Sequence, residues 1–80
     1  MKINGKCLMG DPVLVDRYTA DWHSIVLHPS VFYRRIDQFE EGFKKVRNLY
    51  SEIDNGDRVY IRFQSKDDLT EFYRIHHEYI

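Results

Sequence analysis

The sequence predicts a small α+β domain, one compact unit over residues 1–80, in which a small antiparallel or mixed sheet packs against two helices on one face. Three observations lead to this class. Residues 2–28 contain short apolar runs separated by turn residues, residues 31–53 carry apolar residues at helical spacing, and residues 58–63 alternate between apolar and polar types. Together they predict the element order βββαβα.

Composition and charge restrict the function classes. The chain has 80 residues, of which 42% are hydrophobic and 15% aromatic, enough for one core. Its one cysteine, Cys7, cannot form an internal disulfide, which predicts a reducing, cytoplasmic location. The formal net charge of −1 provides no general attraction to nucleic acid or to anionic lipid. No stretch approaches the roughly 20 apolar residues that span a bilayer, so we expect no membrane partner.

The amino-terminal part is predicted to form strands. Asn4-Gly5 suits a tight hairpin turn, and residues 10–12, Gly-Asp-Pro, mark a second break. Residues 13–18 are then expected to form a strand, and residues 22–28 another whose apolar centre suggests burial on both faces. Pro29 would close that strand because it has no N–H to donate.

Residues 31–53 are predicted to form one long helix. Apolar residues recur there at intervals of 4, 3, 4, 3, 4 and 3. Ser30 is the expected N-cap, and residues 54–56, Asp-Asn-Gly, the expected stop. A competing start lies at Asp37, which would leave residues 31–36 as strand or turn. The stripe consists of Phe32, Ile36, Phe39, Phe43, Val46, Tyr50 and Ile53.

A straight helix over residues 31–53 would extend roughly 35 Å at 1.5 Å per residue, more than a domain of this size accommodates. It would therefore bend, with Gly42 as the weak point, or protrude. If it protrudes, Val46, Tyr50 and Ile53 form an exposed seam. Such a seam would pair with another protein or with a second copy in a homodimer.

The carboxyl-terminal part predicts a strand followed by a helix. Val59, Ile61 and Phe63 should point toward the helices, which leaves Arg58, Tyr60 and Arg62 on the uncovered face of the sheet. Residues 65–68, Ser-Lys-Asp-Asp, resemble a capping box, and we expect a helix from there almost to Ile80. Leu69, Phe72, His76 and Tyr79 would lie along one stripe of this helix.

Two surface features are candidate interaction sites besides the helical seam. The stripe of Arg58, Tyr60 and Arg62 has the residue types that stack on bases and bind phosphates, and also those that protein interfaces favour. An ordinary solvated sheet face is the third reading. Trp22 either covers the edge of the core or lies exposed as an interface residue.

The chemistry-bearing residues predict no metal site, no cofactor and no enzyme. His76 and His77 are adjacent, so a helix would direct them about 100° apart. His23 and His28 would lie on opposite faces of a regular strand, and Cys7 has no partner at zinc-ligand spacing. The glycines are scattered singly and form no phosphate loop.

By elimination, the sequence indicates a non-catalytic module that binds a partner protein and would act by blocking it. In size and in its aromatic and charged surface, the chain is similar in habit to small phage-encoded accessory and inhibitor proteins. The alternative is a single-strand nucleic-acid-binding domain that uses Arg58, Tyr60 and Arg62.

Overall fold

The computed structural model describes residues 6–8 and 11–80, so the turn predicted at Asn4-Gly5 lies outside the described residues. The α+β class is confirmed, but the element order differs from βββαβα. No helix in the described part of the chain is long and apolar enough to cross a membrane. The elements are β1 (Lys6–Leu8), α1 (Pro12–Thr19), β2 (His23–Leu27), α2 (Pro29–Arg34), α3 (Ile36–Phe43), β3 (Leu49–Asp54), β4 (Val59–Phe63), α4 (Lys66–His76) and the 3-10 helix η1 (His77–Tyr79).

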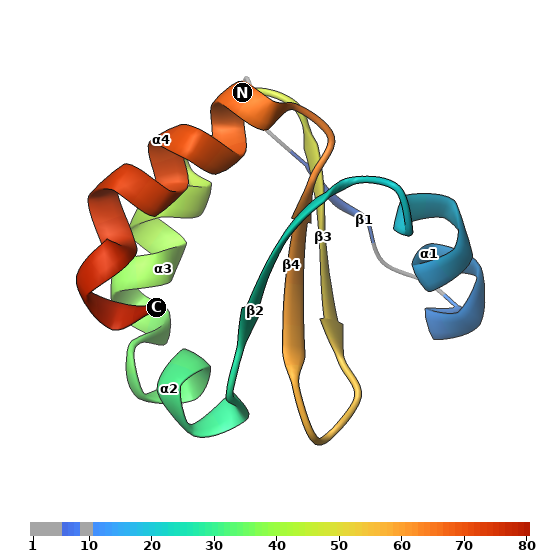
Figure 1. Cartoon of the computed structure of the whole chain (residues 1–80), viewed down its shortest axis with the longest axis horizontal. Helices are drawn as coiled ribbons and strands as arrows, with labels where there is room; N and C mark the ends of the chain where they lie inside the picture. Colours follow the sequence, from blue (N-terminus) through green and yellow to red (C-terminus); the bar gives the residue numbers. More distant parts are fainter. Residues whose placement is uncertain (1–5, 9–10) are drawn as a thin grey trace.

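The strands form a mixed sheet in the order β1-β3-β4-β2. Strand β4 pairs antiparallel with both β2 and β3, and β1 joins the outer edge of β3 in parallel. Helices α3 and α4 cover one face of this sheet, whereas α1 lies on the other (Figure 1). The prediction of two helices on one face therefore describes part of the architecture, since a third helix occupies the opposite side.

The core lies between the sheet and the α3/α4 pair. Val59, Ile61 and Phe63 are buried there, as the alternation in β4 predicts. Phe72 of α4 packs on Phe63 with ring centroids 5.3 Å apart, and on Phe39 of α3 at 5.9 Å. Aromatic rings thus provide much of the contact between the two layers.

The strand predicted over residues 13–18 is wrong, because these residues belong to α1. The Asp11 carboxylate accepts a hydrogen bond of 2.9 Å from the Val13 N–H and caps the helix. Pro12 occupies the first turn, where its missing N–H is not needed and its fixed φ angle favours the helix. The Asp-Pro pair is thus a helix start and not only a break.

The long helix over residues 31–53 is also wrong. It is replaced by α2, α3 and strand β3, and the first break falls at Arg35, whose φ of −116° and ψ of 24° are not helical. Residues 49–54 pair with β1 on one side and β4 on the other, so sheet hydrogen bonds replace the helical ones. Helix α2 is capped by His28, not by Ser30: the His28 Nδ1 accepts from the Ser30 N–H at 3.2 Å.

Two glycines have roles that differ from those expected. Gly56, with a φ of 84°, forms the turn between β3 and β4, where the sequence predicted a helix stop. Gly42 lies within α3 and is not a bend, because α3 ends one residue later at Phe43. A Cβ at Gly42 would come within 2.3 Å of the His76 Nε2, so glycine is needed for the close approach of α3 and α4.

Candidate interaction surface

The second face of the sheet carries Tyr60 and Arg62 of the predicted stripe, and α1 covers part of it, whereas Arg58 is exposed in the connection just before β4. The Arg62 Nη1 forms a 2.8 Å ion pair with the Asp16 carboxylate and donates to the Asp16 carbonyl at 3.0 Å. The Arg62 side chain is only 11% exposed, and its Nε is buried without a hydrogen-bond partner. Arg62 therefore attaches α1 to the sheet and is not a solvated cation.

A buried hydroxyl pair continues this attachment. Thr19 of α1 and Ser51 of β3 are fully buried, and the Ser51 hydroxyl donates to the Thr19 hydroxyl at 3.4 Å. The Thr19 hydroxyl donates in turn to the Val15 carbonyl at 2.8 Å and accepts from Arg62 at 3.1 Å. The contact between α1 and the sheet is thus built largely from hydrogen bonds and an ion pair.

The outward side of α1 carries three apolar side chains beside Arg17, in contrast to the usual amphipathic arrangement, in which such side chains are buried. Val13 is 65% exposed, and Leu14 and Tyr18 are 62% exposed each. The half-buried Trp22 packs edge-on against Tyr18, with ring centroids 5.7 Å apart. We call these four residues the α1 face. The sequence interpretation identified only Trp22 among them, because it treated residues 13–18 as a strand.

A row of three apolar side chains crosses the part of the sheet next to α1. Tyr60 of β4 is the register partner of both Val26 of β2 and Ile53 of β3, so all three point to the same side. Val26 is 42% exposed, and Tyr60 and Ile53 are half-buried. The Arg62 guanidinium lies 5.4 Å from the centre of the Tyr60 ring. Two of the predicted site residues thus meet in the sheet. Tyr60 lies on its predicted strand, whereas Ile53 lies on β3 and not on a helix.

The seam of Val46, Tyr50 and Ile53 does not exist as a surface. Val46 is only 2% exposed and belongs to the core. Tyr50 points to the face opposite Ile53 and stacks on Phe43 with ring centroids 4.9 Å apart. Burial, followed by the nearby charges of Cys7, Glu52 and Glu40, raises the pKa of Tyr50 to about 12. This correction removes the coiled-coil basis for dimerisation.

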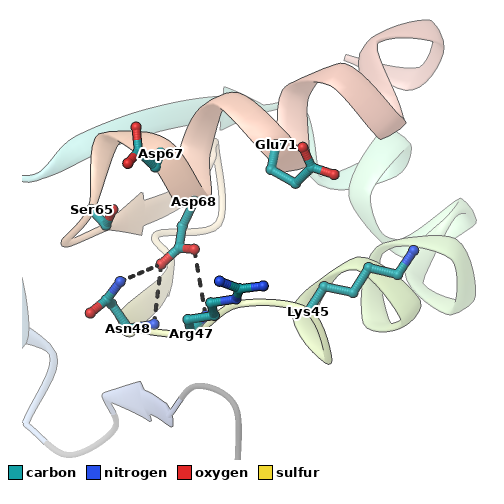
Figure 2. A pocket seen from close by; sticks show the side chains of 7 residues that line it. All are labelled: Lys45, Arg47, Asn48, Ser65, Asp67, Asp68 and Glu71. Carbon is teal, nitrogen blue, oxygen red and sulfur yellow. Dashed lines mark hydrogen bonds between the residues drawn. The ribbon is translucent and has the colours of Figure 1, made fainter.

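A polar hollow lies at the amino-terminal end of α4 (Figure 2). The predicted capping box does not form there, because Ser65 makes no capping side-chain hydrogen bond. The Asp68 carboxylate reaches instead to the segment before β3, where it accepts from the N–H of Asn48 at 3.1 Å and from its side-chain amide at 3.0 Å. Lysine, arginine and carboxylate side chains all line the hollow, which disfavours selection of ions of either sign. Its lining residues are Lys45, Arg47, Asn48, Ser65, Asp67, Asp68 and Glu71.

His76, His77 and Cys7 are the side chains whose chemistry would suit a metal site or catalysis. His76 is 4% exposed, as its place on the helical stripe suggests, and His77 is exposed. Cys7 is half-buried, and burial followed by the charge of Glu52 raises the pKa of its thiol, which disfavours the nucleophilic thiolate. Within residues 6–8 and 11–80, no group of three or more His, Cys, Asp or Glu side chains is placed to hold a metal ion.

No protein-family model, curated protein or solved structure matches the chain. Its function therefore has to be inferred from the chemistry of these surfaces. The α1 face is where large exposed apolar side chains gather on a single element.

Proposed function

We propose that the chain is a non-catalytic interaction module that binds another protein through the α1 face and acts by blocking that partner. The observation that carries the proposal is the outward exposure of Val13, Leu14 and Tyr18 on a helix whose contact with the sheet is polar. Grouped exposed apolar side chains are typical of interaction sites, and tyrosine and tryptophan contribute strongly to binding energy in such sites.

The charges around the α1 face favour a protein as the partner. Asp11, Asp16 and Asp21 lie on or beside α1 around the apolar residues, whereas Arg17 lies between Val13 and Leu14, so the face has a rim with carboxylates and one cation within it. An apolar centre within a polar rim is typical of protein interfaces. Carboxylates at the same place would repel the phosphates of a nucleic acid.

Affinity capture with matched variants tests this proposal. The double substitution Leu14→Ala and Tyr18→Ala removes two exposed side chains without opening the core. Tyr33→Ala is the control, since Tyr33 is 53% exposed but lies on α2. We expect a partner that the wild type and the control retain and the double variant loses, with purified components binding roughly a hundredfold more weakly. Equal retention by all three forms would contradict the proposal.

The nucleic-acid alternative now depends on Arg58 and Tyr60, because Arg62 is bound to Asp16. Fluorescence anisotropy with single-stranded oligonucleotides at about 50 and about 200 mM salt tests it, since phosphate-driven binding weakens steeply over that range. Salt-sensitive binding that Arg58→Ala and Tyr60→Ala both abolish would establish this alternative. Absence of binding at low salt would remove it.

A further inference from the structure

We propose that the free edge of β2 is a second interface, through which two copies of the chain join their sheets. Strand β2 is the outermost strand on the side opposite β1 (Figure 1). Among residues 6–8 and 11–80, no strand pairs with its outer edge. Every second residue of β2 therefore presents its backbone N–H and C=O groups outward, ready to pair with another strand.

This edge lacks the features with which proteins prevent strand addition. Exposed edges are typically interrupted by lysine, proline or a bulge, or kept very short. The five residues of β2, His23–Leu27, include no lysine, arginine, carboxylate or proline, and they pair with β4 in unbroken register. Strand β1, at the other edge, has three residues. The β2 edge is thus longer than the β1 edge and has more backbone groups for pairing with an added strand.

Exposed apolar side chains lie on both sides of the β2 edge. Val26, 42% exposed, is on the sheet face that α1 partly covers. On the other face, α4 packs over β2 and β4, while α3 lies toward β3, as the stacking of Phe43 on Tyr50 shows. The flank of α4 that faces away from α3 is therefore the flank above the free edge.

Tyr73 occupies that outer flank of α4. Ile75 and Phe72 line the contact with α3, and Tyr73 lies about 100° around the helix from Phe72 on the side away from Ile75. Tyr73 is 50% exposed and Leu69, one turn earlier, is partly buried. In the single chain the Tyr73 ring contacts the ring of His77, with centroids 6.4 Å apart, and half of the side chain stays exposed. A strand added to β2 would cover this flank.

The occupant that fits best is a second copy of β2 in antiparallel orientation. A two-fold axis through Ile25 pairs His23 with the second copy's Leu27 and Ser24 with its Val26, so each sheet face remains continuous. No like charges meet within the strand pair. The turn that holds Asp21 comes near the second copy's His28, whose ring Nε2 can donate to a carboxylate because its Nδ1 accepts from Ser30. The edge is therefore compatible with a second copy of itself in sheet register and in charge.

Sedimentation equilibrium over about 10 μM to about 1 mM protein measures the association directly. We expect a monomer–dimer equilibrium that Val26→Lys and Tyr73→Lys each weaken by roughly tenfold or more, because the first places like charges close to the two-fold axis and the second puts a charge into an apolar contact. Leu14→Lys is the matched control on the α1 face and should leave the equilibrium unchanged. A monomer throughout the range, or a dimer lost only with Leu14→Lys, would overturn the proposal.

Hydrogen exchange on the wild-type chain provides a test that needs no variant. Outward-pointing amides of β2 should exchange more slowly at the higher protein concentration, while amides of α1 should not change. Concentration-independent exchange in β2, in a sample that sedimentation shows to be dimeric, would also overturn the proposal. Because the α1 face and the β2 edge share no residue, loss of partner capture and loss of dimerisation are separately measurable.

Discussion

The two faces of the sheet differ in what holds their helices. On the α3/α4 face, aromatic and aliphatic side chains are closely packed, and Phe39, Ile61 and Phe63 are fully buried. On the opposite side of the sheet, where α1 packs, the fully buried side chains are the hydroxyl-bearing Thr19 and Ser51. Since apolar burial provides most of the free energy of folding, one face stabilises the domain. The other is then free to expose apolar groups, to which the proposed function assigns binding.

The largest loss of stability expected from this difference is that caused by replacing Phe39. The ring is 0% exposed and contacts Phe32, Phe72 and His76. Phe39→Ala should lower the free energy of unfolding by about 3–5 kcal/mol, the usual range for a buried phenylalanine. A domain of this size has about 4–12 kcal/mol in total, so the variant should be close to unfolded. Urea denaturation followed by circular dichroism measures the change.

The matched control for Phe39→Ala is Tyr18→Ala on α1. Because Tyr18 is 62% exposed, its loss should change stability by less than about 0.5 kcal/mol. If Tyr18→Ala destabilised the domain as much as Phe39→Ala, the division between a stabilising face and a binding face would be wrong.

A smaller loss is expected for Gly42→Ala. The added Cβ would lie 2.3 Å from the His76 Nε2 and 2.9 Å from the Phe72 Cε2, so α3 and α4 must separate. Overpacking of this kind typically costs about 1–3 kcal/mol, which exceeds the gain of up to about 1 kcal/mol that alanine brings to a helix. Urea denaturation of Gly42→Ala should thus show net destabilisation. A net gain would show that the helices are not in close contact.

The sequence predicted the stabilising face better than the proposed binding face. The alternation in β4 and the stripe in α4 predicted the buried residues correctly, because apolar burial imposes a period of two residues on a strand and 3.6 on a helix. Val59, Ile61, Phe63 and Phe72 all lie where these periods place them. The α1 face was missed because its helix buries a hydroxyl group and exposes valine, leucine and tyrosine. The positions of its apolar residues therefore do not indicate which side of the helix is buried.

The error over residues 31–53 has a different cause. Phe32, Phe39, Phe43 and Val46 do face the core, but the periodicity continues from α3 into β3, and residues 44–48 between them contain no proline or glycine to mark the change. Asp68, 20 residues beyond Asn48, accepts the N–H of Asn48 in the connecting segment. That contact and the pairing of β3 on both sides are long-range, so the local sequence does not reveal them.

Acid should weaken the α3/α4 face through His76. Burial between the rings of Phe39 and Phe72 lowers the pKa of His76, and the charge of Lys45 lowers it further. Because the folded chain binds this proton less tightly than the unfolded chain, stability is complete above about pH 6.5 and falls as the pH drops toward the lowered pKa. Urea midpoints between about pH 7.5 and 5 should decline in the wild type and decline less in His76→Leu. The control, His77→Ala, should keep the wild-type slope; an equal slope in His76→Leu would assign the acid sensitivity to other groups.

The smallest global effect is expected for Arg62, where the second face depends on polar contacts. Arg62→Met removes the ion pair with Asp16 and the hydrogen bond to Thr19, but it also removes the buried, unbonded Nε. Replacing a buried ion by an apolar side chain of similar length is often nearly neutral, so the free energy of unfolding should change by about 1 kcal/mol or less. The attachment of α1 should nevertheless loosen, which hydrogen exchange would detect as faster exchange of α1 amides with unchanged α4 amides. Faster exchange in both helices, or a stability loss as large as that of Phe39→Ala, would mean that Arg62 supports the whole domain, and that the two faces do not have separate roles.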